Sequence, residues 1–268
     1  MSLKKRFAPV VPLNIAEQLL DGNLLGGYHL LLAHDILAHQ SRYEVLAKNI
    51  RARYSDSLII MDNSLIELGH ALQATDLMSA ASIVNADYII VPDALSNSQL
   101  TIDMAAEFLD TYSALAFKNQ RPLMGVVQGH DMWSCTSTFL AMRELGIKAF
   151  AVPRVIVEHM GSRQPLLEWL QGYDYPIHLL GFSDNIEDDL KSCRYCNVMG
   201  IDSAVPIRAG LGKQLLDVQD TKASYGTRGD YWNWRGAIPT PQWVCVEYNL
   251  RYVNNYIQPI DGEYNGMR

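Results

Sequence analysis

Short runs of apolar, β-prone residues recur along the chain, and stretches with helical spacing separate most of them. The runs are continuous and do not alternate with polar residues, which is typical of strands that are buried on both faces. Eight strands are predicted, at residues 9–13, 28–33, 57–61, 87–91, 123–127, 149–152, 177–180 and 198–201. Apolar positions about 3.6 residues apart predict intervening helices around residues 36–46, 72–84, 104–115, 139–145 and 166–170.

About eight strand–helix units in a chain of 268 residues indicate an α/β fold, namely a single (β/α)8 barrel of the TIM type. An open, doubly wound sheet is the competing architecture, because periodicity alone does not exclude it. We expect residues 1–210 to form the barrel. Residues 211–268 are expected to form a C-terminal extension that packs on the barrel and is a candidate for nucleic-acid contact.

Polar residues stand at the ends of six of the predicted strands. They are Asp62, Asp93, Gln128, Arg154, Ser183 and Asp202. Any one of them could simply cap the helix that follows its strand. In a closed barrel, however, the carboxyl ends of the strands converge on one mouth, where barrel enzymes hold their chemistry. Six polar residues at the same step of the repeat therefore predict a shared site at that mouth.

The composition is that of a folded protein without membrane spans. Hydrophobic residues make up 49% of the chain, and no apolar run approaches the roughly 18 residues of a spanning helix. The basic N-terminus leads into a segment that is too short and too broken by proline for a signal peptide. The four scattered cysteines fit a reducing compartment. We therefore expect a cytoplasmic protein.

The cysteines do not predict a metal site. Cys193 and Cys196 form a Cys-x-x-Cys pair, but neither Cys135 nor Cys245 offers the local spacing that a zinc site needs. We expect no metal and no other cofactor. His178 lies within a predicted strand, where a core residue is the expectation.

The net charge of −7 argues against a protein that coats nucleic acid by neutralising phosphates. Residues 203–243 nevertheless carry a net charge of +2, so nucleic-acid contact is expected there. Within this segment aromatic residues are interleaved with arginine and glycine, and the candidates for that contact are Arg228, Trp232 and Arg235. They could stack on extruded bases and contact phosphates. Alternatively, the tryptophans cap the open bottom of the barrel or a pair of helices.

The segment that starts at Asp202 has the layout Asp-x-x-x-Pro-x-Arg-x-Gly and follows an apolar strand. It resembles the segment that carries the nucleophilic aspartate in the tRNA-guanine transglycosylases and their DNA-modifying relatives, which exchange guanine for a 7-deazaguanine base. The resemblance covers about residues 57–210. It implies that Asp202 attacks the sugar and that Asp62 serves as the second catalytic aspartate.

The resemblance also implies how the base is bound. Asp93 stands where the family reads the guanine edge, and Gln128 with Gly129 resembles a strand end that contacts the base. The strand that ends at Pro153 resembles the one whose following backbone amide binds the purine carbonyl. The full set of expected substrate-binding residues is Asn63, Ser64, Asp93, Gln128, Gly129, Pro153, Arg154 and Arg208.

The chain also departs from the family pattern. Asp62 is followed by Asn63, Ser64 and Leu65, where the family has serine, two glycines, an aromatic residue and glutamine. Only Cys245 follows Asp202, so the zinc subdomain of the tRNA enzymes is missing. The first departure concerns how the base is recognised near Asn63 and Ser64. The missing subdomain, together with the short length, favours the short DNA-acting relatives of phages and bacterial modification clusters.

The resulting hypothesis is a glycosyltransferase that replaces guanine in DNA with a 7-deazaguanine base through a covalent aspartyl–sugar intermediate. Its partners would be DNA, free guanine and the free 7-deazaguanine base, and a homodimer is one candidate assembly. Three alternatives stay open. These are the same exchange on tRNA, a hydrolase that uses water as acceptor, and a barrel that binds a purine or nucleic acid without chemistry.

Overall fold

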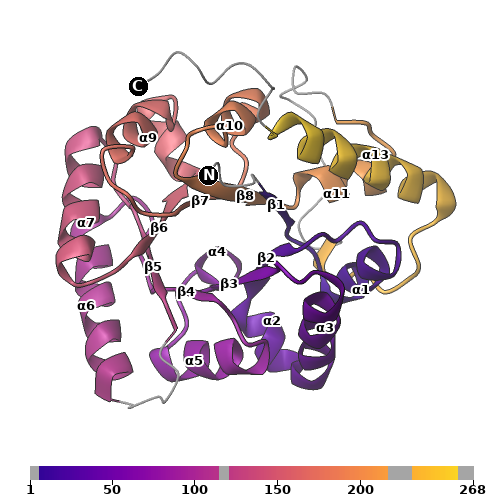
Figure 1. Ribbon diagram of the computed structural model, residues 1–268, viewed down its shortest axis with the longest axis horizontal. Coiled ribbons are helices and arrows are strands. Elements are labelled where there is room, and N and C mark those ends of the chain that lie inside the picture. The colour runs from indigo at the N-terminus through magenta and orange to yellow at the C-terminus, as the bar shows by residue number, and fades with distance from the viewer. Residues whose placement is uncertain (1–5, 115–120, 217–230, 259–268) are drawn as a thin grey trace.

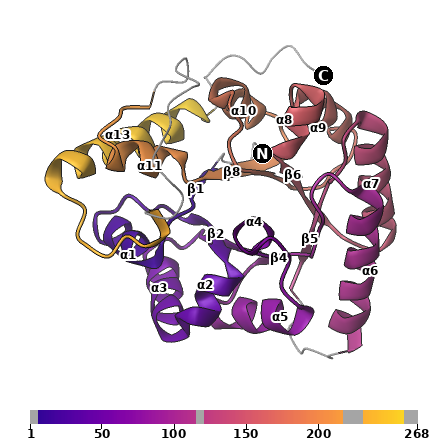
Figure 2. The same cartoon turned by 180° about the vertical axis from the view of Figure 1, so that it is seen from behind.

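The computed structural model describes residues 6–114, 121–216 and 231–258. Eight parallel strands form a nearly closed barrel with helices around its outside, which confirms the predicted (β/α)8 architecture (Figures 1 and 2). The strands are β1 (Arg6–Pro9), β2 (Tyr28–Leu32), β3 (Leu58–Asp62), β4 (Tyr88–Ile90), β5 (Leu123–Val126), β6 (Ala149–Pro153), β7 (Ile177–Leu180) and β8 (Val198–Ser203).

The sheet order is β1-β8-β7-β6-β5-β4-β3-β2. The first strand therefore pairs with the last, with Phe7 opposite Ile201 and Ala8 opposite Asp202. Strands β1 and β2 are neighbours, but within the described residues no ladder joins them. The barrel thus has one seam, which lies between its two N-terminal strands.

The helices of the described residues follow the strands in alternation (Figure 1). They are α1 (Leu13–Asp21), α2 (Ala33–Ala38), α3 (Gln40–Arg53), α4 (Leu65–Leu68), α5 (Ala74–Ile83), α6 (Ser98–Ala114), α7 (Met132–Glu144), α8 (Val155–Met160), α9 (Gln164–Leu170), α10 (Ile186–Ser192), α11 (Val205–Leu211) and α13 (Thr240–Tyr256). Local capping fixes some of their starts, since Asp131 and Ser134 form a capping box at α7. Among these helices none is long and apolar enough to cross a bilayer.

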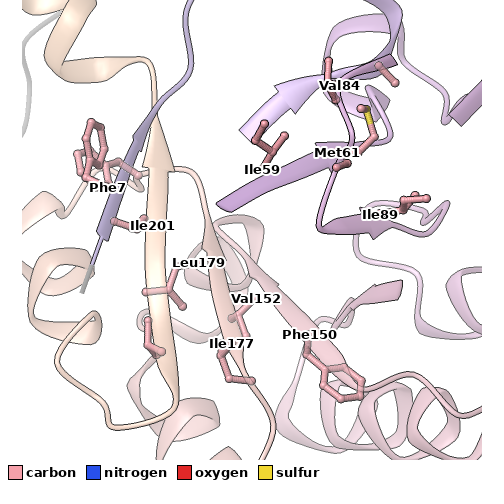
Figure 3. Close-up of a cluster of buried hydrophobic side chains, with 14 of the residues drawn as sticks. Phe7, Ile59, Met61, Val84, Ile89, Phe150, Val152, Ile177, Leu179 and Ile201 are labelled. Atoms are coloured by element: carbon pink, nitrogen blue, oxygen red, sulfur yellow. The ribbon is translucent and has the colours of Figure 1, made fainter. Parts of the chain in front are cut away.

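Side chains of the strands divide between two cores, because successive residues of a strand point to opposite faces. On β3, Ile59 and Met61 pack in the layer between the sheet and the helices, whereas Ile60 belongs to the barrel interior. Figure 3 shows the outer layer, with Ile59 and Met61 on one side and Ile201 of β8 on the other. The strands are buried on both faces, as their continuous apolar runs predict.

The first strand differs from its prediction. It was expected at residues 9–13, but β1 ends at Pro9 and Leu13 already begins α1. Pro12 has no N–H to give to a ladder, and its carbonyl instead accepts the N–H groups of Ile15 and Ala16. The proline therefore ends the strand segment and starts the helix.

The helix expected around residues 36–46 is also different. Two helices, α2 and α3, cover this region and meet at His39, whose φ of −134° and ψ of 41° are not helical. Val45, one of the apolar residues of this stretch, is 56% exposed. The buried face of α3 is instead formed by Tyr43, Leu46, Ala47 and Ile50.

The described part of the C-terminal extension packs on the barrel through α13, which lies against α11. Gly210 permits this contact, since a β-carbon there would lie 2.6 Å from the Cα of Val246. The buried side chain of Asn249 joins the two segments by donating to the carbonyls of Pro206 and Gln214 and accepting from the N–H of Leu216. The expected boundary at residue 210 falls inside α11.

Candidate active site

A cavity of about 540 Å³ lies at the carboxyl ends of the strands. Most of the residues predicted for the site line it, namely Asp62, Asn63, Asp93, Gln128, Pro153, Arg154, Asp202, Arg208 and Trp232. They come from five strand ends and from the segments after β8, as expected for the mouth of a barrel. Ser183 does not line the cavity. Its N–H and hydroxyl donate to Asp189 of α10, so Ser183 ties the loop before this helix to it, while Asn185 is the N-cap of the helix.

Asp202 is the penultimate residue of β8 and is buried, with an exposed fraction of 6%. Its Oδ1 atom lies 3.0 Å from Nε2 of His178 and accepts the N–H of Gly181 at 3.1 Å. Gly181 has a φ of +70°, a conformation that glycine adopts without strain. The carboxylate is therefore held in one orientation at the wall of the cavity.

Asp62 is the last residue of β3 and lies at the same cavity as Asp202. Burial raises the pKa of Asp62 well above its usual value, and the negative charge of Glu67 raises it further. The charges of Asp202 and Asp93 act in the same direction, while a hydrogen bond from the N–H of Ser64 to Oδ2 at 2.8 Å opposes them. Asp62 is thus suited to carry a proton at the cavity wall.

Asp93 forms a buried cluster with two side-chain amides. Its Oδ1 accepts from Asn63 at 2.6 Å and its Oδ2 accepts from Gln128 at 2.6 Å. Burial raises the pKa of Asp93, and these two hydrogen bonds oppose the increase. The Oε1 atom of Gln128 accepts the N–H of Ser96, which fixes which end of the amide faces Asp93.

The hydrogen bonds decide which groups of this cluster can meet a ligand. The amide of Asn63 donates to both Asp93 and the carbonyl of Val91, and its oxygen accepts from Leu65. Both amide protons of Asn63 and its side-chain oxygen are therefore engaged in hydrogen bonds within the protein. An amide nitrogen has two protons, so Gln128 keeps one beyond its bond to Asp93. That proton is the donor available for a carbonyl group in the cavity.

The backbone amide expected to bind the purine carbonyl is occupied. Pro153 has no N–H, and the N–H of Arg154 donates to the carbonyl of Leu180 at 2.9 Å as the ladder between β6 and β7 continues. The side chain of Arg154 reaches the cavity instead. Of the two residues, only this guanidinium can donate to a ligand.

Two predicted substrate-binding residues do not line the cavity. Ser64 is buried with a φ of +65°, and its hydroxyl accepts the N–H of His34. Gly129 lies against the start of α7, where a β-carbon would come within 2.7 Å of the backbone nitrogen of Cys135. Both residues shape the backbone next to the site.

The segment after β8 contributes to one wall of the cavity. Tyr231 is buried and donates to the carbonyl of Val10 at 2.6 Å, and its ring packs edge-on against Trp232. Trp232 is half-buried at the cavity. Arg235 is exposed and does not line the cavity, and Arg228 lies outside the described residues.

The charges of the cavity wall are unbalanced. Within the described part of the chain, the acidic residues that line it are Asp62, Glu67, Asp93, Glu158 and Asp202, against Arg154 and Arg208. The acidic residues outnumber the arginines even when Asp62 carries a proton, so the wall favours an uncharged or cationic ligand over an anionic one, except beside Arg154 and Arg208.

The sequence-based reasoning missed two residues that support the site. His178 was expected to be a core residue; it is buried, but it also contacts Asp202. Tyr28 was not considered, and it contacts His178 from β2. Strand alternation could have indicated His178, because Ile177 and Leu179 face the outer layer and the residue between them must face the interior.

In the residues that the structure describes, no group of three or more His, Cys, Asp or Glu side chains is arranged to hold a metal ion. Comparison of the chain with protein-family models and with curated proteins finds no match. The geometry of the cavity is therefore the feature that points to a function.

Proposed function

We propose that this protein is a glycosyltransferase that replaces guanine in DNA with a 7-deazaguanine base through a covalent aspartyl–sugar intermediate. One observation carries the proposal. Two carboxyl groups of unlike surroundings, Asp202 and Asp62, line the same cavity. Base exchange needs such a pair, since one carboxylate must attack C1′ and another carboxyl group must protonate the departing base.

The surroundings of the two aspartates support this division of roles. Asp202 accepts two hydrogen bonds on Oδ1, which stabilise it as an anion and orient it. Asp62 has a raised pKa, so it can hold the proton that the leaving purine takes. When the incoming base attacks, Asp62 accepts the proton back.

The cluster around Asp93 supports guanine as the recognised base. The Asp93 carboxylate can accept from the N1–H and the exocyclic amine, and the second amide proton of Gln128 can be donated to O6. Adenine has the opposite pattern at these positions and would leave buried polar atoms without partners. Such mismatches give strong discrimination.

DNA is proposed as the polymer for two reasons. Residues 203–268 contain one cysteine, Cys245, and therefore lack the zinc ligands of the subdomain that the tRNA enzymes carry. Trp232 stands at the cavity wall, where it can stack on a nucleotide that has been extruded from the strand.

The test is to incubate the protein with labelled guanine and, in parallel, single-stranded DNA, duplex DNA and tRNA. We expect label to enter DNA, and we expect a covalent protein–DNA adduct to be detected by mass spectrometry after denaturation. Asp202→Asn should fold normally but show neither label nor adduct. Asp184→Asn, which changes an exposed aspartate in the loop after β7, is the matched control.

Exchange by Asp202→Asn at close to the wild-type rate would contradict the assigned mechanism. Label in tRNA and in no DNA would change the polymer and leave the chemistry at Asp202 intact. Binding of guanine without any incorporation would indicate a barrel that binds purines without chemistry.

A further inference from the structure

His178 of β7 lies behind Asp202 and makes a hydrogen bond through each ring nitrogen. Nε2 lies 3.0 Å from Oδ1 of Asp202, and Nδ1 lies 2.7 Å from the hydroxyl oxygen of Tyr28. All three residues are buried. Because Tyr28 is the first residue of β2, these contacts cross the barrel interior and connect β2, β7 and β8.

The partners determine where the protons lie. An ionised carboxylate can only accept, so the contact at Oδ1 of Asp202 requires a proton on Nε2 of His178. Tyr28 keeps its own proton, because burial and then the nearby charge of Asp202 raise its pKa well above the usual value. Its hydroxyl can therefore donate to Nδ1, which is the acceptor in a neutral ring that carries Nε2–H.

The barrel makes room for this polar chain. The interior around it is apolar and includes Leu30, Ala151 and Met199. At Gly200, a β-carbon would lie 2.2 Å from the carbonyl oxygen of Arg6 and 2.7 Å from Cε1 of Tyr28, so a larger residue there would clash with both the backbone of β1 and the tyrosine ring. Apolar residues would fill the same space without buried groups that need partners. What Tyr28 and His178 add, compared with apolar residues, is the hydrogen-bonded contact with Asp202.

The hydrogen bonds to Asp202 are all on one oxygen. Gly181 donates its N–H to Oδ1, as His178 does, and within the described residues no hydrogen bond reaches Oδ2. We propose that Tyr28 and His178 are positioning residues, which fix Oδ1 as the accepting side of Asp202 and leave Oδ2 as the attacking atom. This inference rests on the proposed function, because Oδ2 attacks a sugar C1′ only if the protein exchanges bases.

The reaction step then has a defined direction. A lone pair of Oδ2 forms the bond to C1′, the electrons of the C1′–N bond leave with the purine, and the purine takes the proton of Asp62. Oδ1 becomes the carbonyl oxygen of the ester and still accepts Nε2–H of His178. When the incoming base attacks C1′, the electrons return to Oδ2 and the proton of that base passes to Asp62.

The first test is spectroscopic and does not require turnover. The ¹⁵N resonances of the histidine rings are recorded for the wild type, and those of His178 are assigned by their loss in His178→Gln. We expect a neutral ring with the proton on Nε2, and in Tyr28→Phe we expect the Nδ1 resonance to move towards that of an imine nitrogen without a donor. Any other protonation pattern of the wild-type ring overturns the proposal.

The second test separates positioning from structural support. Tyr28→Phe should slow adduct formation by roughly ten-fold, and His178→Leu by roughly a hundred-fold, with guanine affinity unchanged. His178→Gln, whose amide N–H can replace Nε2–H, should recover part of the loss. Tyr43→Phe is the control, since it removes another buried tyrosine hydroxyl, which donates to Asp35 away from the cavity.

Wild-type rates in both Tyr28→Phe and His178→Leu would overturn the positioning role and leave the proposed function standing. Loss of guanine affinity in parallel with the rate would also overturn it, because that result indicates general damage to the site. If the wild type shows the expected ring protonation but no base exchange, the hydrogen-bonded chain stands and the proposed function falls.

Discussion

The three aspartates of the cavity differ in what surrounds each carboxyl group. Asp202 accepts from a histidine and a backbone amide, and Asp93 accepts from two side-chain amides. Asp62 has one backbone N–H and faces the charges of its neighbours. Differences of this kind allow identical side chains to take opposite protonation states in one site.

The charge of Glu67 offers a way to test the role of Asp62. After burial, the negative charge of Glu67 is the largest cause of the raised pKa of Asp62. Removing this charge in Glu67→Gln should therefore lower the pKa of Asp62. In the proposed mechanism adduct formation needs Asp62 protonated, so its rate should fall as pH rises through this pKa. We therefore expect the alkaline limb of the pH–rate profile for adduct formation to move to lower pH in Glu67→Gln. Glu44→Gln, a change on the exposed side of α3, should leave the profile in place, and an unmoved limb in Glu67→Gln would contradict the role of Asp62.

Asp93 should determine the affinity for the base. Removing one buried hydrogen-bonding partner costs about 1–3 kcal/mol, so Asp93→Ala should weaken guanine binding by roughly ten-fold or more. The same change leaves the amides of Asn63 and Gln128 without their acceptor. Calorimetric titration with guanine measures the effect, and Asp103→Ala on the exposed face of α6 is the control. Unchanged affinity would remove Asp93 from the binding site.

At the scale of elements, the side chain of Asn249 holds α13 against the barrel. Its three hydrogen bonds reach backbone groups near α11, and the residue is fully buried. Asn249→Ala should lower the free energy of unfolding by about 2–5 kcal/mol, since it leaves several buried backbone groups unpaired. Urea denaturation measures this change. Asn254→Ala, an exposed position on the same helix, should change stability by less than about 0.5 kcal/mol, and equal effects of the two variants would refute the docking role.

The strongly apolar strands could be predicted from the sequence, and so could the polar residues at the strand ends, whereas the long helix α13 was not expected. Seven of the eight strands lie within about two residues of their expected positions, because a strand buried on both faces leaves a continuous apolar run. The shift of β1 follows from Pro12, which ended a run that looked uniformly apolar. Short helices such as α8 and α10 were not expected, since six or seven residues are too few to show a helical period.

Parts of the site could not be predicted because they depend on contacts between distant residues. Tyr28 and His178 are 150 positions apart and meet only once the barrel forms. The occupied N–H of Arg154 depends on how far the ladder between β6 and β7 extends, which the residue types do not encode. The positions of the strand ends predict which residues line the cavity. The direction of each hydrogen bond depends on the three-dimensional arrangement and could not be predicted.

For the whole molecule, His29 predicts how stability depends on pH. The pKa of His29 is lowered from 6.5 to about 4, chiefly by burial and to a smaller extent by the charge of Arg51, while a hydrogen bond with the backbone of Gly26 opposes the shift. The folded protein therefore keeps this ring neutral while the unfolded chain protonates it below pH 6.5. The stabilisation is complete above pH 6.5 and is lost progressively as pH falls to about 4, by on the order of 3 kcal/mol.

Comparing variants separates the contribution of His29 to the pH dependence of the unfolding free energy from the contributions of other titrating side chains. Between pH 7 and pH 4 the unfolding free energy of His29→Gln should fall less steeply than that of the wild type. His70→Gln removes an exposed histidine and should keep the wild-type slope. Parallel slopes for all three proteins would show that His29 does not couple folding to pH.

Binding of the polymer is also a property of the whole molecule. An enzyme that acts on an extruded nucleotide should use single-stranded DNA at least as well as duplex, since the unpairing cost of a few kcal/mol is absent. Trp232→Ala should weaken DNA binding with little change in salt dependence, whereas Arg228→Ala should flatten that dependence. Fluorescence anisotropy over a salt series distinguishes the two effects, and equal salt slopes in both variants would count against these roles.

The pairing of β1 with β8 has a consequence for how the chain is made. Strand β1 is the first to leave the ribosome, and its ladder partner, in which Phe7 faces Ile201, follows 194 residues later. At about 5–20 residues per second, the first strand waits for about 10 to 40 s before its edge can be covered. The same late strand carries Asp202, so a nascent chain gains its closing strand and its candidate nucleophile together. Any product truncated before residue 198 therefore leaves this edge of β1 uncovered and lacks Asp202, the candidate nucleophile.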